Sequence, residues 1–426
     1  MFTRARIAIL AVLVTVPAAF AAADDPAPPR EAAEALQSLG VVTHLDYRRT
    51  PYEDLSRVQA ALRYIGIDRL RDMTPHANPR PYELLAAQGF RFNFVIRSEA
   101  AGQLPATVRT LEAFARRFQG SIVSVEGLNE IKIWPANYHG LGGFTAGVAV
   151  QRDLFALIRQ SPELRRIPVL ALTLGGASAA DHARLGDLSD YADQGNAHVY
   201  FDGRVPSSSW RFALDLAQRS TPRLPSTAVT ETGYSSAAGT PQGVPAEVQA
   251  KYLLVLIAEA WRQNVPALYL YQLVDDRRDE NDWSKSLGLY DADWQPKPAA
   301  HAIHHLTHNL ASSSKTPEPP RAFPYAIAGQ SADVKSLMLR KADGTFDLLV
   351  WREVRLWDER ERRMISVEPR IVSVTAGAAR TSRIDTLTGE RRELARDTQT
   401  LEFVIEDRPV IIEFVPQSTK PRTLEK

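Results

Sequence analysis

The strongest constraint on the fold is a rhythm in which short apolar segments alternate with longer amphipathic ones over residues 36–312. Apolar runs of about four to eight residues between helical stretches are typical of βα units, whose strands form a parallel sheet. Eight units in about 270 residues match a (β/α)8 barrel, an α/β fold. The runs that we interpret as strands are VVTHLDY from Val41, DRLRDM from Asp68, FRFNFVI from Phe90, SIVSVEGL from Ser121, PVLALTL from Pro168, NAHVYF from Asn196, STAVTE from Ser226 and PALYLYQL from Pro266.

An open, doubly wound sheet is the alternative architecture for such a rhythm. That fold usually carries a glycine-rich phosphate-binding turn after its first strand. Here the first predicted strand ends in HLDY, without such a turn. The barrel is therefore the favoured interpretation, and we assign residues 36–312 to it.

The chain changes character after Ala311, where the Ser/Pro-rich stretch ASSSKTPEPP indicates a linker. The segments that follow are short, β-branched and alternating, and turn signals such as ADGT and LTGE separate them. We predict a small antiparallel β-sandwich over residues 322–417. Trp351 and Trp357 of this domain are candidates for carbohydrate binding, the alternative being that both lie in its core.

The first 23 residues have the three parts of a secretory signal: Arg4 and Arg6, the apolar run IAILAVLVTV, and small residues that end at Ala23. The apolar run is too short to cross a bilayer comfortably, since a spanning helix needs about 20 apolar residues. We expect cleavage, export to the periplasm or beyond, and no stable membrane span, with a retained anchor as the alternative. Segment 24–35, which begins DDPAPPR, is typical of an exposed linker.

Charge and cysteine content exclude several classes of function. Lys plus Arg (51) nearly balance Asp plus Glu (50), so the chain lacks the general positive excess that holds nucleic acid. No cysteine occurs, which removes disulfides, thiol nucleophiles and thiolate metal sites. We expect a monomer that does not bind nucleic acid.

Polar side chains gather where the predicted strands end. Reactive groups of a (β/α)8 barrel lie at the carboxyl ends of its strands, where the eight βα loops converge. In the order of the strands, the candidates are His44, Asp46, Arg71, Asn129, Glu130, His198, Tyr200, Glu231, Tyr269, Tyr271 and Gln272.

Glu130 and Glu231 end the fourth and seventh strands and should face each other across the mouth of the barrel. Two such carboxyl groups about 5 to 5.5 Å apart suit double displacement at a sugar, where one protonates the leaving oxygen and the other attacks the anomeric carbon. Arg71, His198 and Tyr200 could support them. A guanidinium or a donated hydrogen bond lowers the nucleophile's pKa, and an apolar pocket raises that of the acid.

Four segments resemble clan GH-A glycoside hydrolases: SVEGLNE, TETGY, HVY and LGLYDADWQPKPAAHAI. Within that clan the chain is most similar to family 39 and its neighbours, which include bacterial enzymes that cut exopolysaccharides. The resemblance covers the barrel from about Gly40 to Leu310. It implies that Glu130 is the acid/base and Glu231 the nucleophile.

The resemblance also implies that Asn129 binds the sugar 2-hydroxyl and that Arg71 and Tyr200 orient Glu231. Glu126 matches a carboxylate that such enzymes often carry inside the strand. One departure concerns the eighth strand, which ends in YLYQLVDD where many clan members have a tryptophan.

Several candidates have alternative explanations. Glu130 and Glu231 could be surface charges, and Glu126 could be the acid, although strand alternation places it inside the barrel. Trp134 and Trp283 could stack on a sugar or pack under their loops. His44 and Asp46 could bind a sugar hydroxyl or make structural hydrogen bonds, and His198 could be a core histidine.

For two further groups of residues, a structural role is the favoured interpretation. The run DDRRDENDWSK from Asp275 is more typical of a solvated loop than of a site. A histidine cluster at helical spacing suggests metal, but it follows the last strand and has few carboxylates near it, so we predict no metal site and no cofactor. The cluster comprises His301, His304, His305 and His308.

The sequence thus predicts a retaining glycosidase that cleaves O-glycosidic bonds in a polysaccharide or oligosaccharide. A transglycosylase would use the same residues with a sugar acceptor in place of water. A non-catalytic, polysaccharide-binding barrel is the alternative outside enzyme chemistry.

Overall fold

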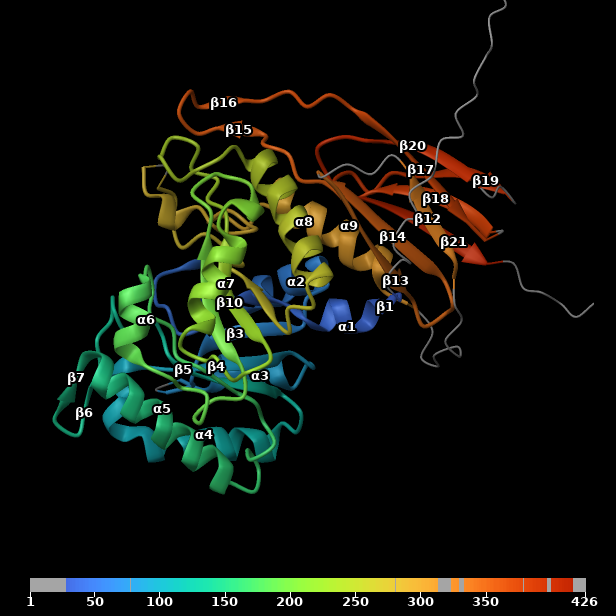
Figure 1. Ribbon diagram of the computed structural model, residues 1–426. Helices are drawn as coiled ribbons and strands as arrows, with labels where there is room; N and C mark the ends of the chain where they lie inside the picture. Colours follow the sequence, from blue (N-terminus) through green and yellow to red (C-terminus); the bar gives the residue numbers. More distant parts are fainter. Residues whose placement is uncertain are drawn as a thin grey trace, which may run out of the picture.

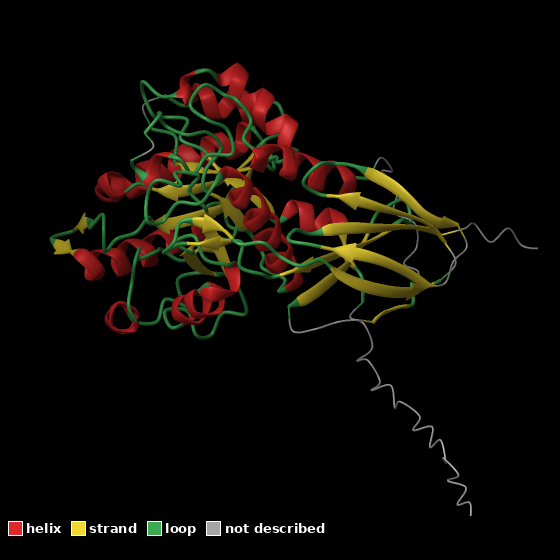
Figure 2. Cartoon of the chain, turned by 90° about the horizontal axis from the view of Figure 1, so that it is seen from above, coloured by secondary structure: helices red, strands yellow, loops and turns green. Residues whose placement is uncertain are grey.

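The computed structural model describes residues 28–76, 78–279, 281–312, 323–328, 333–377, 379–396 and 400–416. It consists of a barrel of strands and helices beside a β-sandwich (Figures 1 and 2). The predicted signal peptide, residues 1–23, and most of the predicted linker at 311–320 lie outside the described residues. Within the described part of the chain, we find no helix whose length and apolar content would let it cross a bilayer.

Eight parallel strands form the barrel, which confirms the predicted fold class. They are hydrogen-bonded in the order β8-β5-β4-β3-β2-β11-β10-β9. The outer strands β8 and β9 close the ring, because Asp193 N donates to Val169 O (2.8 Å) and Ala171 N to Gln194 O (3.0 Å). The strands are β2 (Leu39–Val42), β3 (Arg69–Met73), β4 (Arg91–Ile96), β5 (Ile122–Leu128), β8 (Val169–Leu170), β9 (Gly195–Tyr200), β10 (Thr227–Gly233) and β11 (Leu268–Leu270).

Helices surround the strands as the rhythm requires. Helix α2 shows why: its buried residues Val58, Ala61, Leu62 and Ile65 recur at helical spacing, and Gly66 ends it with φ 66°. The α-helices are α1 (Ala32–Gln37), α2 (Leu55–Ile65), α3 (Arg80–Ala86), α4 (Leu104–Arg117), α5 (Gly143–Gln160), α6 (Ala179–Leu185), α7 (Trp210–Gln218), α8 (Ala246–Arg262) and α9 (Pro298–Leu310).

Short elements lie in the connections between strands and helices. The 3-10 helices are η1 (Pro51–Glu53), η2 (Ser98–Gln103), η3 (Pro206–Ser208) and η4 (Trp283–Lys285). A small hairpin after β5 joins β6 (Asn137–Tyr138) to β7 (Leu141–Gly142).

The second domain is the predicted sandwich, with one addition. A six-stranded sheet, β1-β13-β14-β21-β18-β19, lies against a three-stranded sheet, β12-β17-β20, and their facing side chains form a separate apolar core. The strands are β1 (Arg30–Glu31), β12 (Tyr325–Ala328), β13 (Val334–Arg340), β14 (Phe346–Arg352), β17 (Arg370–Ala376), β18 (Ala379–Asp385), β19 (Arg391–Arg396), β20 (Thr400–Ile405) and β21 (Val410–Pro416), with β15 (Trp357–Asp358) and β16 (Arg363–Met364) in a hairpin.

The addition is β1, which comes from the predicted linker 24–35 and corrects that prediction from Arg30 onward. Strand β1 pairs in parallel with β13, and Arg340 Nε donates to the Glu31 carboxylate at 2.9 Å. Helix α1 begins at once, with Ala32 and Ala35 buried. Because residues 30–37 are few and rich in alanine, their sequence did not indicate that β1 and α1 connect the start of the barrel to the sandwich.

The two domains share a continuous apolar core, in which helix α8 is buried on all sides between barrel and sandwich (Figure 1). Trp351 is fully buried there, and its indole N–H donates to Glu259 of α8 at 3.3 Å. Trp357 is also buried in this cluster. Both tryptophans are core residues, so the proposal that they bind carbohydrate is wrong.

Candidate active site

Strands β3, β5, β9 and β10 and the residues directly after them bring seven residues that the sequence analysis named into one hydrogen-bonded network. Arg71, from β3, is its centre. Its guanidinium donates to both oxygens of Glu126 at 2.8 Å, to Glu231 at 2.6 Å and to Asn129 Oδ1 at 2.8 Å. One buried cation thus fixes two carboxylates and an amide through directional, charge-assisted bonds.

Glu126 is the innermost member and is fully buried. Besides Arg71, it accepts hydrogen bonds from Asn93 (3.0 Å) and Thr230 (3.2 Å). Burial alone would raise the pKa of Glu126, but the Arg71 guanidinium outweighs burial and holds that pKa below its usual value. Glu126 is therefore an ionised support for Arg71, and nothing in this geometry suits it to donate a proton to a substrate.

Glu130 and Glu231 meet across the mouth. One oxygen of each carboxylate and a ring nitrogen of His198 all lie within 4.8 Å of one another. Their side chains are 18% and 11% exposed, whereas Glu126 has no exposure. The two carboxylates are therefore mostly buried and lie close together, which excludes the reading of both as ordinary surface charges.

Glu231 is held at both oxygens. Arg71 binds Oε1, and the Tyr200 hydroxyl donates to Oε2 at 3.0 Å. Burial and the nearby charge of Glu231 raise the pKa of Tyr200, so this hydroxyl stays protonated and remains a donor. The pairing of β10 with β9 shifts between Val229 and Glu231, and such an irregularity re-aims a side chain at the end of a strand.

Glu130 sits on an unusual backbone, with φ 45°. Few side-chain-bearing residues adopt this region, and strain of this kind is most often kept at functional sites. Thr173 accepts the Glu130 N–H at 3.0 Å, and a Cβ added at Gly175 would lie 2.9 Å from the Glu130 Cβ. Thr173 and Gly175 thus give the glutamate its place. The sequence analysis singled out neither residue: Thr173 lay inside the predicted strand 168–174, which ends at Leu170, and Gly175 lay just beyond it.

His198 lies between the two glutamates. Its Nδ1 is 2.8 Å from Glu130 Oε1 and 3.7 Å from Glu231 Oε2, and Nε2 is 3.2 Å from the Thr230 hydroxyl. Burial would lower the pKa of His198, but the two carboxylates outweigh burial and raise it. The reading of His198 as a core histidine without a role in the site is therefore disfavoured.

The same contact changes the expectation for Glu130. Burial would raise the pKa of its carboxyl, but the hydrogen bond and charge of His198 lower it overall. The raised pKa expected for the acid from an apolar pocket is thus wrong, because a basic group stands next to the carboxyl. When the pair carries one proton, these opposite shifts favour His198 over Glu130 as its holder.

Glu130, His198 and Glu231 also have the spacing of metal ligands. The Arg71 guanidinium, 2.6 Å from Glu231, already places a positive charge beside this set, which disfavours a cation there. Within the described part of the chain, the four histidines of α9 do not form a metal-ligand group. His301 and His304 instead contact Tyr64 of helix α2.

The ends of β2 and β11 form the other side of the mouth. His44 Nε2 lies 3.2 Å from the Tyr271 hydroxyl, and its ring stacks on Tyr47 with centroids 4.3 Å apart. Burial lowers the pKa of His44, so the ring is neutral. Tyr47, which the sequence analysis did not single out, therefore belongs to this wall together with Tyr271.

Three predicted contacts are placed less centrally. Asp46 forms an ion pair with Arg97 instead of reaching the network. Trp134 is 60% exposed and lies one turn beyond Glu130. The backbone N–H of Trp134 donates to the Glu130 carbonyl. Trp283, within the charged run after β11, points its ring edge at Tyr200 with centroids 6.2 Å apart. Tyr269 and Gln272 are buried behind the mouth.

Comparisons with known proteins identify the fold. No family model matches the chain, and no curated protein matches it by sequence. Among solved structures, it resembles a family 39 glycoside hydrolase from the gut symbiont Bacteroides cellulosilyticus, with 15% identity and a TM-score of 0.64 over 91% of this chain and 83% of that one. A glucosidase from Croceicoccus marinus has 11% identity and a TM-score of 0.62 over 92% and 97%. At these identities the likeness concerns the fold.

Proposed function

We propose that the chain is a retaining glycoside hydrolase, with Glu231 as the nucleophile and Glu130 as the acid/base. One observation carries the proposal: oxygens of these glutamates lie within 4.8 Å of each other, and both side chains are partly exposed. Double displacement needs carboxyl groups about 5 to 5.5 Å apart, whereas an inverting enzyme leaves room for water at roughly 6.5 to 9.5 Å. The fold shared with a family 39 glycoside hydrolase and a glucosidase supports the choice of a glycosidase.

The first step forms a covalent intermediate. A Glu231 oxygen attacks the anomeric carbon while the bond from that carbon to the leaving oxygen breaks, and Glu130 gives its proton to the leaving oxygen. Arg71 and Tyr200 keep Glu231 ionised and aimed. In the second step Glu130 takes a proton from water, whose oxygen replaces Glu231 on the carbon.

His198 supplies the proton that the first step needs. It holds the shared proton 2.8 Å from Glu130 in the free protein. A sugar in the mouth excludes water and so raises the free energy of the ionised Glu130 carboxylate. The proton therefore moves from Nδ1 of His198 to that carboxylate. We also propose that Asn129 binds the sugar 2-hydroxyl through its NH2 group, since Arg71 occupies its carbonyl oxygen.

The proposed substrate is a polysaccharide or oligosaccharide, and we propose that the chain meets it outside the cytoplasm, since residues 1–23 have the pattern of an export signal. Screening purified protein against aryl glycosides and exopolysaccharides would identify the sugar.

Chemical rescue tests the assignment of Glu130. On an activated aryl glycoside, Glu130→Ala should form the intermediate but release it slowly, because the leaving group needs no acid while the attacking water needs a base. Azide needs no base, so it should restore turnover and yield a glycosyl azide of retained configuration. Glu126→Ala serves as the control, without azide rescue. Unimpaired turnover by Glu130→Ala, or an azide product of inverted configuration, would overturn the proposal.

A further inference from the structure

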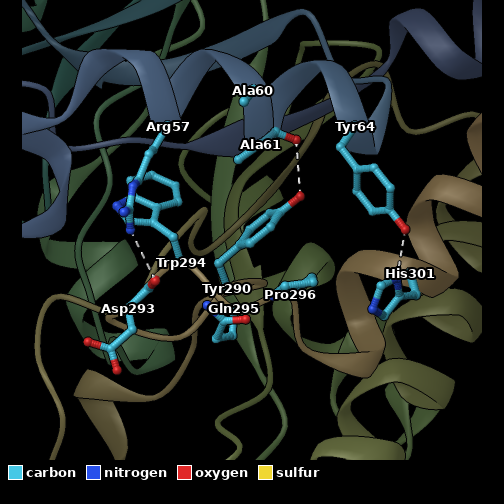
Figure 3. A pocket seen from close by; sticks show the side chains of 10 residues that line it. All are labelled: Arg57, Ala60, Ala61, Tyr64, Tyr290, Asp293, Trp294, Gln295, Pro296 and His301. Atoms are coloured by element: carbon cyan, nitrogen blue, oxygen red, sulfur yellow. Dashed lines mark hydrogen bonds between the residues drawn. The ribbon is translucent and has the colours of Figure 1, made fainter.

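A hollow of about 540 Å³ opens on the flank of the barrel, between helix α2 and the chain that leads into α9 (Figure 3). Its volume falls within the roughly 300 to 1,000 Å³ of small-molecule sites. None of its lining residues belongs to the network around Arg71. The lining residues are Arg57, Ala60, Ala61, Tyr64, Tyr290, Asp293, Trp294, Gln295, Pro296 and His301.

One wall comes from a single face of α2. Arg57, Ala60, Ala61 and Tyr64 stand at positions i, i+3, i+4 and i+7, which lie along one side of a helix. The two alanines leave room between the longer side chains at either end. The small residues at these two positions of α2 therefore create the space for the hollow.

The opposite wall is aromatic and fixed in place. The rings of Tyr290 and Trp294 have centroids 6.0 Å apart, and the Tyr290 hydroxyl donates to Ala61 O at 3.3 Å. Figure 3 shows two further ties across the hollow. Arg57 donates to Asp293 O at 3.3 Å, and the Tyr64 hydroxyl lies 2.6 Å from His301 Nδ1. A wall held from both sides needs little ordering when a ligand binds.

The charges around the hollow are already compensated. Arg57 lies 3.4 Å from Asp54, and Asp293 is paired with Arg278. Aromatic rings, alanines and the neutral Gln295 amide supply the rest of the surface. This chemistry selects neither an anion nor a cation. It fits an uncharged ligand that has an apolar face and a hydroxyl edge, which describes a pyranose ring against indole and phenol.

We propose that this hollow is a second carbohydrate-binding site, which holds neutral sugar units of a polysaccharide chain away from the site of cleavage. That the bound chain is the polymer cleaved at the mouth rests on the proposed function. The connection from β11 to α9 carries both Trp283, beside Tyr200, and Trp294, in the hollow. A polymer long enough to reach from Trp294 to the mouth has a raised local concentration there, whereas a short substrate gains nothing.

The test counts binding sites by calorimetric titration with cellohexaose, laminarihexaose and mannohexaose. At least one of these should occupy one more site on the native protein than on Trp294→Ala or Ala60→Leu, where affinity at that site falls about tenfold or more. Ala60→Leu fills the hollow while keeping a good helix former. The control is Phe212→Ala, which removes a 71% exposed aromatic of helix α7 outside the hollow.

Each outcome of the titration either supports or overturns the second carbohydrate-binding site. Equal stoichiometry in native and variant proteins, including no binding of any probe, overturns the inference, as does preferential binding of trigalacturonate at Trp294. Turnover of a small aryl glycoside by Trp294→Ala should stay within about twofold of native, because only a bound polymer uses the second site. The count needs no turnover, so a protein that cleaves nothing yet loses a site with Trp294 refutes the proposed function and supports the second site.

Discussion

The two sides of the barrel mouth differ in the chemistry of their side chains. On the side of β3, β5, β9 and β10, charged groups bind one another: Arg71 alone donates hydrogen bonds to Glu126, Glu231 and Asn129. On the side of β2 and β11, neutral aromatic groups such as Tyr271 predominate.

This difference separates the reaction from the recognition of the sugar. A network of paired charges holds reacting groups in one geometry, as preorganised catalysis requires. A neutral aromatic wall can instead contact a sugar ring through its ring faces and hydroxyl groups. Substitutions on the first side should therefore alter the rate for every substrate, and those on the second should alter the preference among substrates.

The largest effect is expected at Arg71. Arg71→Met should lower kcat about a thousandfold on every substrate, since Glu231 loses its cation and Glu126 is left buried and uncompensated. Breaking a buried ion pair by removing one partner costs about 3–5 kcal/mol of stability. Urea unfolding and steady-state kinetics measure both effects. The double substitution Arg71→Met with Glu126→Gln is the control and should regain stability without regaining activity.

A smaller effect concerns pH. In the native protein the last proton of the Glu130–His198 pair leaves with a pKa above the usual histidine value, because the carboxylates raise the pKa of His198. His198→Gln leaves that proton on a carboxyl alone, so the basic limb of kcat/KM should move to lower pH. A pH profile on one aryl glycoside measures the shift. An unmoved basic limb would exclude His198 as the proton holder.

The same histidine gives a signed prediction for stability. Its folded pKa is raised, so its contribution is fully present below the usual pKa of about 6.5 and is lost as pH rises through the folded value. The native protein should therefore lose stability across that window relative to His198→Gln. Thermal unfolding at pH 6 and pH 9 compares the two. A constant difference between them would contradict the assignment.

The smallest effect is expected on the neutral side. Tyr271→Phe removes the hydroxyl that lies 3.2 Å from His44, a bond worth about 1 kcal/mol, or roughly fivefold. The change should alter the ratio of kcat/KM between sugars that differ in one hydroxyl and leave the better substrate nearly unchanged. Equal losses on all sugars would place Tyr271 with the reaction instead, and would erase the distinction between the two sides.

Much of this arrangement could be predicted from the sequence, because its signals are local. Period and length identified the eight barrel strands, and the position of Glu130 and Glu231 at strand ends predicted that they would meet. The end of strand β8 could not be predicted, because residues 171–174 continue its apolar pattern but lie beyond its last residue, Leu170. Helix α8 is buried all round only because the sandwich covers its outer face.

The electrostatics of the site were the least predictable part. That His198 would stand between the glutamates depends on the register of β9 against β10, where Glu231 pairs with His198 and Gly233 with Tyr200. A one-residue slip would turn these side chains to the other face. The sequence carries no local signal for that register, so the lowered pKa of Glu130 could be found only from the folded chain.

The most direct test of the account is to trap the covalent intermediate. The protein is incubated with a 2-deoxy-2-fluoro glycoside of the sugar found in the substrate screen, digested and analysed by mass spectrometry. The account predicts one fluoroglycosyl group per chain, on the peptide that contains Glu231, and none on Glu231→Gln. A label on Glu130 or Glu126, or complete turnover of a natural substrate by Glu231→Gln, would contradict it.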